Sequence, residues 1–515
     1  MEQMNINFYI SIIDCKNINE IENFINYVNK NDEIDIIFEM YNNKLLTSER
    51  LQYIMNHCTK YFKVSSNLIK KLIIEEKVAL LDIIFKHLKF FDNNSILQLL
   101  LYYKNKKATS FSNLKQKISD DKFKILIKAK YSKYKYDINK YLINECEKKY
   151  PNVYIIKYLI DHGVDINKTC IGSKIPLFVA CKCGHETIVK YLIKHGADIN
   201  KTNDEGETSL FSACLSRNET IVKYLVEQGV DINTENNRKE TPLFNACSSG
   251  EEAIVKYLVE QGADINKPNF YYRTPLFNAC ENGHIAVVKY LVERGADINM
   301  EVRYYRSSFA GRVFGETPLF RTCSNGHEAV VKYLIEHGAD INKENGDGET
   351  PLFHACKSGN EAIVKCLVEH GANINKTKCD CKTPLFIACE NGHEAIVKYL
   401  VGQGANLNVA IDYNNLRISK RDSGETALFK ACESGNEAMV KCLIEHGADI
   451  NIESTGGKTP LFNACLSKNV AVVKYLVELG ADINKSNKYG KTPLSMARNS
   501  GNEVIIKYLI EHGAV

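Results

Sequence analysis

Cysteine and histidine are the residues of this sequence that could do chemistry, as nucleophiles, general bases or metal ligands. The chain has 18 Cys and 13 His among 515 residues. Nine of the Cys recur in register, at Cys181, Cys214, Cys247, Cys280, Cys323, Cys356, Cys389, Cys432 and Cys465. Regular recurrence indicates that packing sets these positions, so we interpret them as small buried hydrophobic residues. Neighbours would lie about 10 Å apart, too far for a disulfide.

Cys379 and Cys381 depart from this register, with Asp380 between them at a predicted hairpin tip. A zinc site needs about four ligands, and its Cys pairs are usually separated by two or more residues. No second pair lies nearby in the sequence. We therefore expect an exposed loop with two thiols, and no bound metal.

The histidines also recur, in two sets. One set follows the first glycine of a repeated unit, at His185, His284, His327 and His393. The other precedes the second glycine, at His162, His195, His337, His370, His446 and His512. No group of nucleophile, base and orienting residue stands out from this background, and no phosphate-binding glycine loop does. We expect no cofactor and no enzymatic activity.

The elements that position these residues repeat along the chain. Thr-Pro-Leu-Phe, or a close variant, begins at Ile175, Thr208, Thr241, Thr274, Thr317, Thr350, Thr383, Thr426, Thr459 and Thr492. Neighbouring copies are 33 residues apart, except for two steps of 43. The longer steps predict ten-residue insertions, within 300–316 and within 409–425.

One unit, from Thr241 to Asn266, predicts a helix, a tight turn and a second helix. Thr241 can cap the first helix, and Pro242 suits its first turn because the missing N–H has no partner there to lose. Gly250 ends that helix in the left-handed conformation that glycine adopts without a Cβ penalty. In two units Arg217 or Lys468 replaces this glycine, at a cost of roughly 1 kcal/mol each if the conformation is kept. The apolar stripes of both helices must be covered by neighbouring units, so the units must stack.

This period resembles the ankyrin repeat, together with the motifs TPLFxAC, Gly-His-Glu, IVKYL and HGADIN. The resemblance covers residues 137–515 and implies about eleven repeats in an all-α solenoid of helix-turn-helix units with short β-hairpin-like tips. The usual signature has His where nine of these units have Phe, for example Phe244 and Phe320. That departure gives the first helix an apolar contact and removes a polar one.

Residues 1–136 show helical apolar spacing without a clean period. We expect a helical N-terminal region, and whether it consists of decayed repeats or is a separate domain stays open. The last unit should act as its own cap, because Ser495, Arg498 and Asn499 make its first helix polar.

Charge offers a second function. Residues 104–135 carry 11 Lys against two Asp, although the net charge of the whole chain is only +4. The alternative function is therefore a nucleic-acid-associated regulator that uses this basic segment, with the repeats as a docking arm. A solvated helical surface explains the same lysines, and we favour that explanation because Lys is abundant throughout.

Residues that vary between near-identical units are the candidates for recognition. One such position follows the Phe of the first helix and holds Arg321, His354 and Lys430 in three of the units. The resemblance places it toward the concave face, where neutral variation at an exposed site is the alternative. The hairpin tips contribute Phe270, Tyr271, Tyr272 and Arg273, and the first insertion contributes Arg303, Tyr304, Tyr305 and Arg306.

Aromatic rings interleaved with Arg are typical of interface hot spots. A longer hairpin whose rings pack on each other explains the first insertion equally well. We expect a monomeric scaffold or adaptor, resident in the cytosol or nucleus, that binds one or more proteins through its concave face and tips. No apolar run is long enough to span a membrane, and we expect neither a small-molecule substrate nor a nucleic acid as partner.

Overall fold

The chain divides into two compact units, Met1–Asp198 and Ile199–Val515. The computed structural model describes residues 36–57, 138–151, 153–161, 164–170, 172, 174–305, 312–412 and 423–515, with residues 10, 11, 13, 14, 65, 68, 71, 72, 75, 77, 79, 80, 83 and 84. Over these residues, no helix has the length and apolar character needed to cross a bilayer.

The first unit is helical in its described part. Its helices are α3 (Ile36–Asn42), α4 (Ser48–His57), α10 (Ile138–Glu147), α11 (Val153–Asp161), α12 (Pro176–Lys182) and α13 (Glu186–Lys194). Helix α10 packs on α12 and α11 packs on α13, which is the packing of two stacked helix pairs. Helices α3 and α4 bury Ile37, Met40, Leu51 and Ile54. The expected extent of a helical N-terminal region over 1–136 stays a prediction.

The second unit is a row of helix pairs. The first helices of the pairs are α14 (Ser209–Leu215), α16 (Pro242–Ser249), α18 (Pro275–Glu281), α20 (Pro318–Asn325), α22 (Pro351–Ser358), α24 (Pro384–Glu390), α26 (Ala427–Ser434), α28 (Pro460–Ser467) and α30 (Pro493–Ser500). The second helices are α15 (Glu219–Glu227), α17 (Glu252–Glu260), α19 (Ile285–Glu293), α21 (Glu328–Glu336), α23 (Glu361–Glu369), α25 (Glu394–Gly402), α27 (Glu437–Glu445), α29 (Val470–Glu478) and α31 (Glu503–Glu511).

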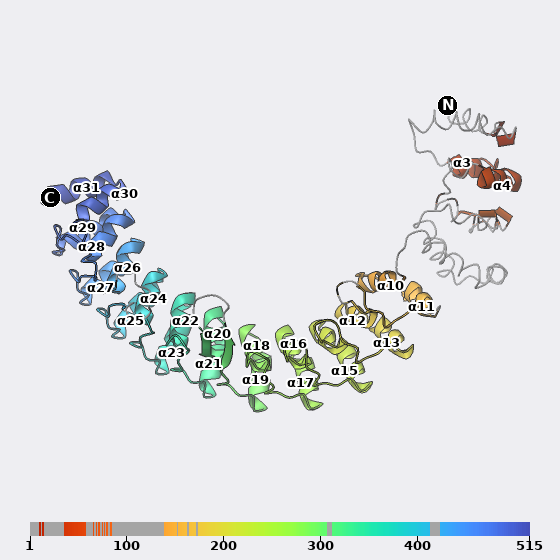
Figure 1. The fold of residues 1–515 in the computed structure, drawn as a ribbon, viewed down its shortest axis with the longest axis horizontal. Coiled ribbons are helices and arrows are strands. Elements are labelled where there is room, and N and C mark those ends of the chain that lie inside the picture. The colour runs from red at the N-terminus through yellow and green to blue at the C-terminus, as the bar shows by residue number, and fades with distance from the viewer. Residues whose placement is uncertain are drawn as a thin grey trace. The chain divides into compact units, whose positions relative to one another are not determined.

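Each first helix packs on the next first helix, and each second helix on the next second helix. From α16 to α27, the first helices follow the inner side of the curved row and the second helices its outer side (Figure 1). The inner side therefore carries the residues of the Thr-Pro-Leu-Phe helices.

The core of this row consists of repeated side chains. Phe211, Phe244, Phe320 and Phe429 are fully buried, and so are the eight register Cys from Cys214 to Cys465, as Cys181 is in the first unit. Burial raises the pKa of the register thiols from Cys214 to Cys465, for example that of Cys465 to about 12. A protonated, enclosed thiol is a poor nucleophile and metal ligand, so the interpretation of these Cys as packing residues is confirmed.

The helix ends follow the predicted pattern with one correction. Gly250 ends α16 at φ 78°, and Arg217 and Lys468 take the same left-handed conformation at φ 59° and 64°. Thr241 stands at the N-cap of α16, but its hydroxyl accepts no hydrogen bond from the helix. The predicted Thr cap therefore fails in this unit. The described caps that keep such a bond in this series are those of Thr383 and Thr492.

The first insertion begins and ends as a β-hairpin. Strand β1 (Val302–Tyr305) pairs antiparallel with β2 (Arg312–Glu316), with Arg303 opposite Phe314 and an irregularity between Val302 and Arg303. The hairpin interpretation of this insertion is confirmed at the level of the backbone. Packing between its rings stays a prediction, because the side chains of Tyr304 and Tyr305 are outside the described part.

Candidate protein-binding surfaces

The first set of histidines connects neighbouring repeats. His284 Nε2 lies 3.0 Å from the carbonyl oxygen of Ser248, and His327 Nε2 lies 3.1 Å from that of Glu281. The ring of His284 also covers Gly250, so closely that a Cβ at residue 250 would lie 2.5 Å from His284 Nδ1. These histidines hold stacked units together, as expected for scaffold residues.

The second set of histidines contacts backbone carbonyl oxygens at the C-terminal ends of the second helices. His337 Nδ1 lies 2.8 Å from the carbonyl oxygen of Tyr333, and His446 Nδ1 lies 2.8 Å from that of Cys442. The last carbonyls of a helix lack intrahelical donors, so a ring N–H at this position supplies one. His162 is outside the described residues.

A row of asparagines, which sequence reasoning missed, connects the repeats at the turn after the second helix. Asn266 Nδ2 donates to Gly295 O at 3.1 Å, and Asn266 Oδ1 accepts from the backbone N–H of Asp297 at 2.8 Å. Asn233, Asn299, Asn408, Asn451 and Asn484 make the same two bonds. The signal was present in the sequence as the constant Asn of the Ala-Asp-Ile-Asn motif.

The variable position of the first helix is partly enclosed. His354 is 17% exposed, Arg321 27% and Lys430 20% by side chain. Asn245 at the equivalent place donates to Phe211 O at 3.2 Å. These side chains therefore use their polar atoms within the solenoid, and their predicted place on a recognition surface stays a prediction.

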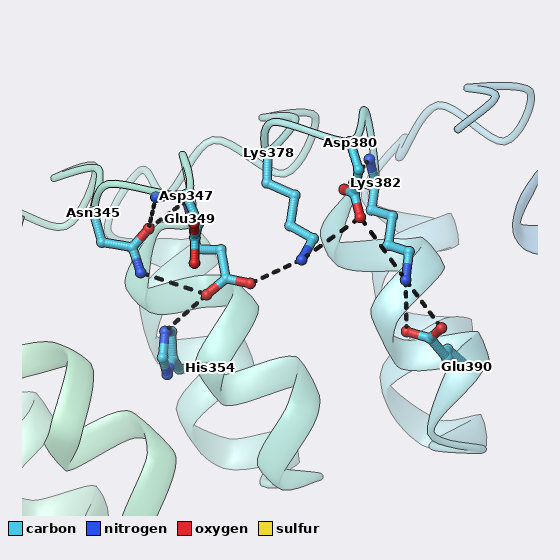
Figure 2. A network of polar contacts seen from close by, with 8 residues as sticks. All are labelled: Asn345, Asp347, Glu349, His354, Lys378, Asp380, Lys382 and Glu390. Carbon is cyan, nitrogen blue, oxygen red and sulfur yellow. Dashed lines mark hydrogen bonds and ion pairs between the residues drawn. The ribbon is translucent and has the colours of Figure 1, made fainter. Parts of the chain in front are cut away.

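His354 belongs to a charged network on the inner side of α22 and α24, shown in Figure 2. Its Nε2 lies 3.3 Å from Glu349 Oε2, and Glu349 Oε1 accepts from Lys378 Nζ at 3.1 Å. Lys382 Nζ continues the row, 3.1 Å from Glu390 Oε1 and 4.0 Å from Asp380 Oδ2. A small cavity of about 210 Å³ opens among these side chains.

The opposite charges of Glu349 and Lys378 stabilise each other in this network. Burial alone would raise the pKa of Glu349, but the contacts with His354 and Lys378 outweigh it and lower the pKa to about 2. Burial would lower the pKa of Lys378, yet the charges of Glu349 and Asp380 raise it. Both groups are therefore charged at neutral pH. The charge of each offsets the cost of burying the other.

Arg321 and Lys430 are paired in the same way. Arg321 Nε lies 3.4 Å from Glu316 Oε2 and 3.9 Å from Glu281 Oε1, and Glu281 Oε2 in turn accepts from Arg273 at 3.2 Å. Lys430 Nζ lies 3.2 Å from Glu425 and 2.7 Å from Glu433. Their role in recognising a partner stays a prediction.

The tips near the first insertion differ from this paired interior. Phe270 is 56% exposed, and Tyr271 and Tyr272 are each 45% exposed. Lys239 Nζ lies 5.3 Å from the centre of the Phe270 ring, and the Arg303 guanidinium lies 5.0 Å from that of Tyr272. We call Lys239, Phe270, Tyr271, Tyr272 and Arg303 the tip surface.

Backbone bonds hold the tip surface together. Phe270 N donates to Arg238 O at 3.0 Å, and Arg303 N donates to Tyr271 O at 2.8 Å. The structure therefore brings Arg303 of the insertion onto the neighbouring tip, as the sequence predicted. Arg306 and residues 413–422 of the second insertion are outside the described residues, as is the basic segment 104–135.

The Cys379-Asp380-Cys381 tip forms a turn in which only one of the thiols is well exposed. Cys379 is exposed and Cys381 half-buried, and Asp380 Oδ1 accepts from the backbone N–H of Lys382 at 3.2 Å. The Asp380 carboxylate thus faces Lys378 and Lys382 rather than a cluster of metal-ligating groups.

Comparisons with known proteins identify the architecture. The family model described as "Ankyrin repeats (3 copies)" matches residues 148–236, 228–302, 305–378, 376–454, 411–487 and 454–515. Among solved structures, the crystal structure of the human ASB11 ankyrin repeat domain matches at 28% identity and TM-score 0.40, over 45% of this chain and 99% of that chain. A search of curated proteins finds no match.

The predicted fold class, an all-α ankyrin-type solenoid, is confirmed by the family match. Ankyrin repeats are generally modules for binding other proteins, and the family generally acts without catalysis. The matched segments cover well over half of the 515 residues and follow the helix pairs described above. The chain belongs to the ankyrin repeat family.

Proposed function

We propose that this chain is a scaffold or adaptor that holds one or more proteins against the inner side of its second unit and against the hairpin tips. The observation that carries the proposal is the run of three exposed rings at Phe270, Tyr271 and Tyr272. Exposed aromatic clusters next to Arg are the usual composition of binding hot spots.

The repeated residues support this proposal by elimination. The register Cys fill the core, and the described repeated His and Asn connect units or complete helix ends. Positions fixed by such tasks cannot distinguish one partner from another. Recognition then falls to side chains that differ between units, which are the tips and the charged inner row around Arg321, His354 and Lys430.

The mechanism in this proposal is presentation. A stacked row of units offers a long surface whose parts are spaced by the repeat, so a partner can contact several tips at once. We further propose that the chain works as a monomer in the cytosol or nucleus, without a small-molecule substrate. The alternative, a nucleic-acid-associated regulator, depends on residues 104–135 and stays a prediction.

The test is affinity capture with the full chain, read by mass spectrometry. The tip variant is Phe270→Ala with Tyr271→Ala, and the matched control is Tyr489→Ala, which removes another exposed tip ring, 77% exposed. We expect specific proteins to be retained by wild type and control and lost from the tip variant. Retention of the same proteins by all three, or of none by wild type, would contradict the proposal.

The inner row needs its own variant. Arg321→Ala with His354→Ala removes two of the three predicted inner-side residues and leaves the tips intact. Loss of a separate set of captured proteins would show that the inner side binds a partner of its own. Capture identical to that of wild type would confine recognition to the tips.

A further inference from the structure

Tyr272 occupies a backbone position that glycine holds in other repeats. The equivalent tip residues are Gly206, Gly348, Gly457 and Gly490, at φ between 70° and 77°, and Tyr272 has φ 60°. The turn is the same, because Tyr272 N donates to Asn269 O at 2.9 Å as Gly348 N does to Asn345 O. A left-handed conformation costs a residue with a Cβ about 1–2 kcal/mol.

Packing does not compensate for this strain. Tyr272 is 45% exposed, so burial covers only about half of its surface. Lys239, one repeat earlier, has the same strain at φ 58° and is also exposed. Two neighbouring tips thus keep a bulky side chain where glycine would fit better. Residues in strained backbone conformations are often found at binding sites, so the strain at these tips points to a binding function.

The cations of the tip surface have no carboxylate partner among the described residues. Lys267 and Lys343, near the same tips, are paired with Glu235 at 2.7 Å and with Glu301 at 2.5 Å. Lys239 and Arg303 instead lie over the Phe270 and Tyr272 rings. Each can still bind an approaching anion, because a ring uses none of the cation's N–H groups as a full hydrogen-bond acceptor would.

We propose that the tip surface binds an extended acidic segment of a partner protein, in which Asp or Glu residues flank an aromatic or large aliphatic side chain. The apolar side chain packs on the Phe270 and Tyr272 rings, and the carboxylates reach Lys239 and Arg303. This proposal rests on the proposed function and names the partner chemistry of one of its surfaces.

Charge favours a peptide over a nucleic acid. A nucleic-acid strand needs a continuous basic groove along its backbone, whereas the tip surface has two cations, Lys239 and Arg303. Glu205 lies exposed on the tip that precedes that of Lys239. Its carboxylate would repel a run of phosphates, but a short segment with two or three acidic residues avoids it.

The test selects peptides from two display libraries with the full chain as bait. One library is biased toward Asp and Glu around a random apolar residue, and the other is the same library with Lys and Arg in their place. We expect enrichment from the acidic library alone. Selected peptides are then labelled, and their affinity is measured by fluorescence anisotropy for wild type and variants, with a poly-dT oligonucleotide as a parallel probe.

Two glycine variants separate binding from folding. Tyr272→Gly relieves the strained position and removes a ring, so its unfolding midpoint should not fall while affinity weakens at least about tenfold. Cys381→Gly relieves the same strain at φ 63° outside the tip surface and should bind like wild type. Arg303→Glu should weaken binding further by placing a like charge against the peptide.

Four results would overturn the inference: no enrichment, enrichment of basic peptides, binding by Tyr272→Gly at wild-type affinity, or oligonucleotide binding as tight as that of the peptides. In any of these cases the proposed scaffold function stands if the capture experiment still finds proteins that depend on the inner row. Failure of both experiments would remove the function as well.

Discussion

The repeat interior keeps the same contacts from unit to unit, whereas the residues of the tips vary. The repeat from Thr241 has no insertion, and the connection after Asn299 carries ten extra residues, yet their stacking bonds agree: Asn266 to Gly295 O and Asn299 to Gly338 O both measure 3.1 Å. At the tips the residues change from one unit to the next, and Lys239, Tyr272 and Cys381 take strained conformations. The difference teaches that stacking is fixed by a few constant contacts, while the tips are free to vary.

The largest expected effect comes from the interior. Phe320→Ala should lower the free energy of unfolding by about 3–5 kcal/mol, because it leaves a cavity in a fully buried site. Tyr271→Ala, at the tip surface, should change it by less than about 0.5 kcal/mol. Urea denaturation followed by circular dichroism measures both. Similar losses in the two variants would break the comparison.

The next effect tests the contact between His284 and Gly250. Gly250→Ala combines a Cβ at φ 78° with a clash against the His284 ring, and should cost about 2 kcal/mol or more. Gly501→Ala is the matched control, since residue 501 has φ 70° and nothing within 4 Å of its Cβ. Adding His284→Ala to Gly250→Ala should recover part of the loss. An equal loss in the variant and the control would show that the ring contact contributes nothing.

A smaller effect tests whether the insertion leaves stacking unchanged. Asn299→Ala removes the bonds to Gly338 O and to the Asp340 N–H, and should cost roughly 1–2 kcal/mol. Asn266→Ala, which has no insertion after it, should cost the same. Hydrogen exchange should show faster opening at Asp340 in one variant and at Asp297 in the other. A much smaller loss for Asn299→Ala would mean that the insertion weakens the stack.

The smallest expected effect is the dependence of stability on pH through Glu349. The pKa of Glu349 in the folded chain, about 2, lies below its ordinary value of 4.5. Its pairing therefore stabilises the fold fully above pH 4.5, and this contribution is lost as the pH falls toward 2. Glu349→Gln should lower stability by about 1 kcal/mol at pH 7, allowing for solvent screening, and the gap to wild type should begin to narrow below pH 4.5 and close toward pH 2.

The control for this pH dependence is Glu240→Gln. Glu240 holds the equivalent place in its repeat but contacts the amides of Asn236 and Asn269 rather than cations. Melting temperatures between pH 2 and 7 should show no closing gap for this variant. A gap for Glu349→Gln that stays constant with pH would refute the pairing described for the network.

The repeated part of the fold could be predicted because each unit carries its own start and stop residues. Pro242 and Gly250 bound one helix by local conformational preference, and copies 33 residues apart repeat the signal. The missing Thr241 cap could not be predicted, because it depends on side-chain geometry of a few tenths of an ångström. The asparagine row was readable as a constant residue, but its partners, 29 and 31 residues away, follow only from stacking.

The candidate site was predicted in part. The exposed rings at Phe270 to Tyr272 and the approach of Arg303 followed from adjacent tips in a stack. The enclosure of Arg321, His354 and Lys430 did not, because it depends on how closely neighbouring first helices pack and on which carboxylates face them. The strain at Tyr272 was visible only once the tips were compared position by position.

The asparagine bonds that bridge the insertion also bear on design. Because Asn299 reaches Gly338 and Asp340 with its usual geometry, the ten extra residues within 300–316 leave the stacking bonds unchanged. A foreign peptide grafted between residues 305 and 312 should therefore leave the stacking of the neighbouring repeats intact.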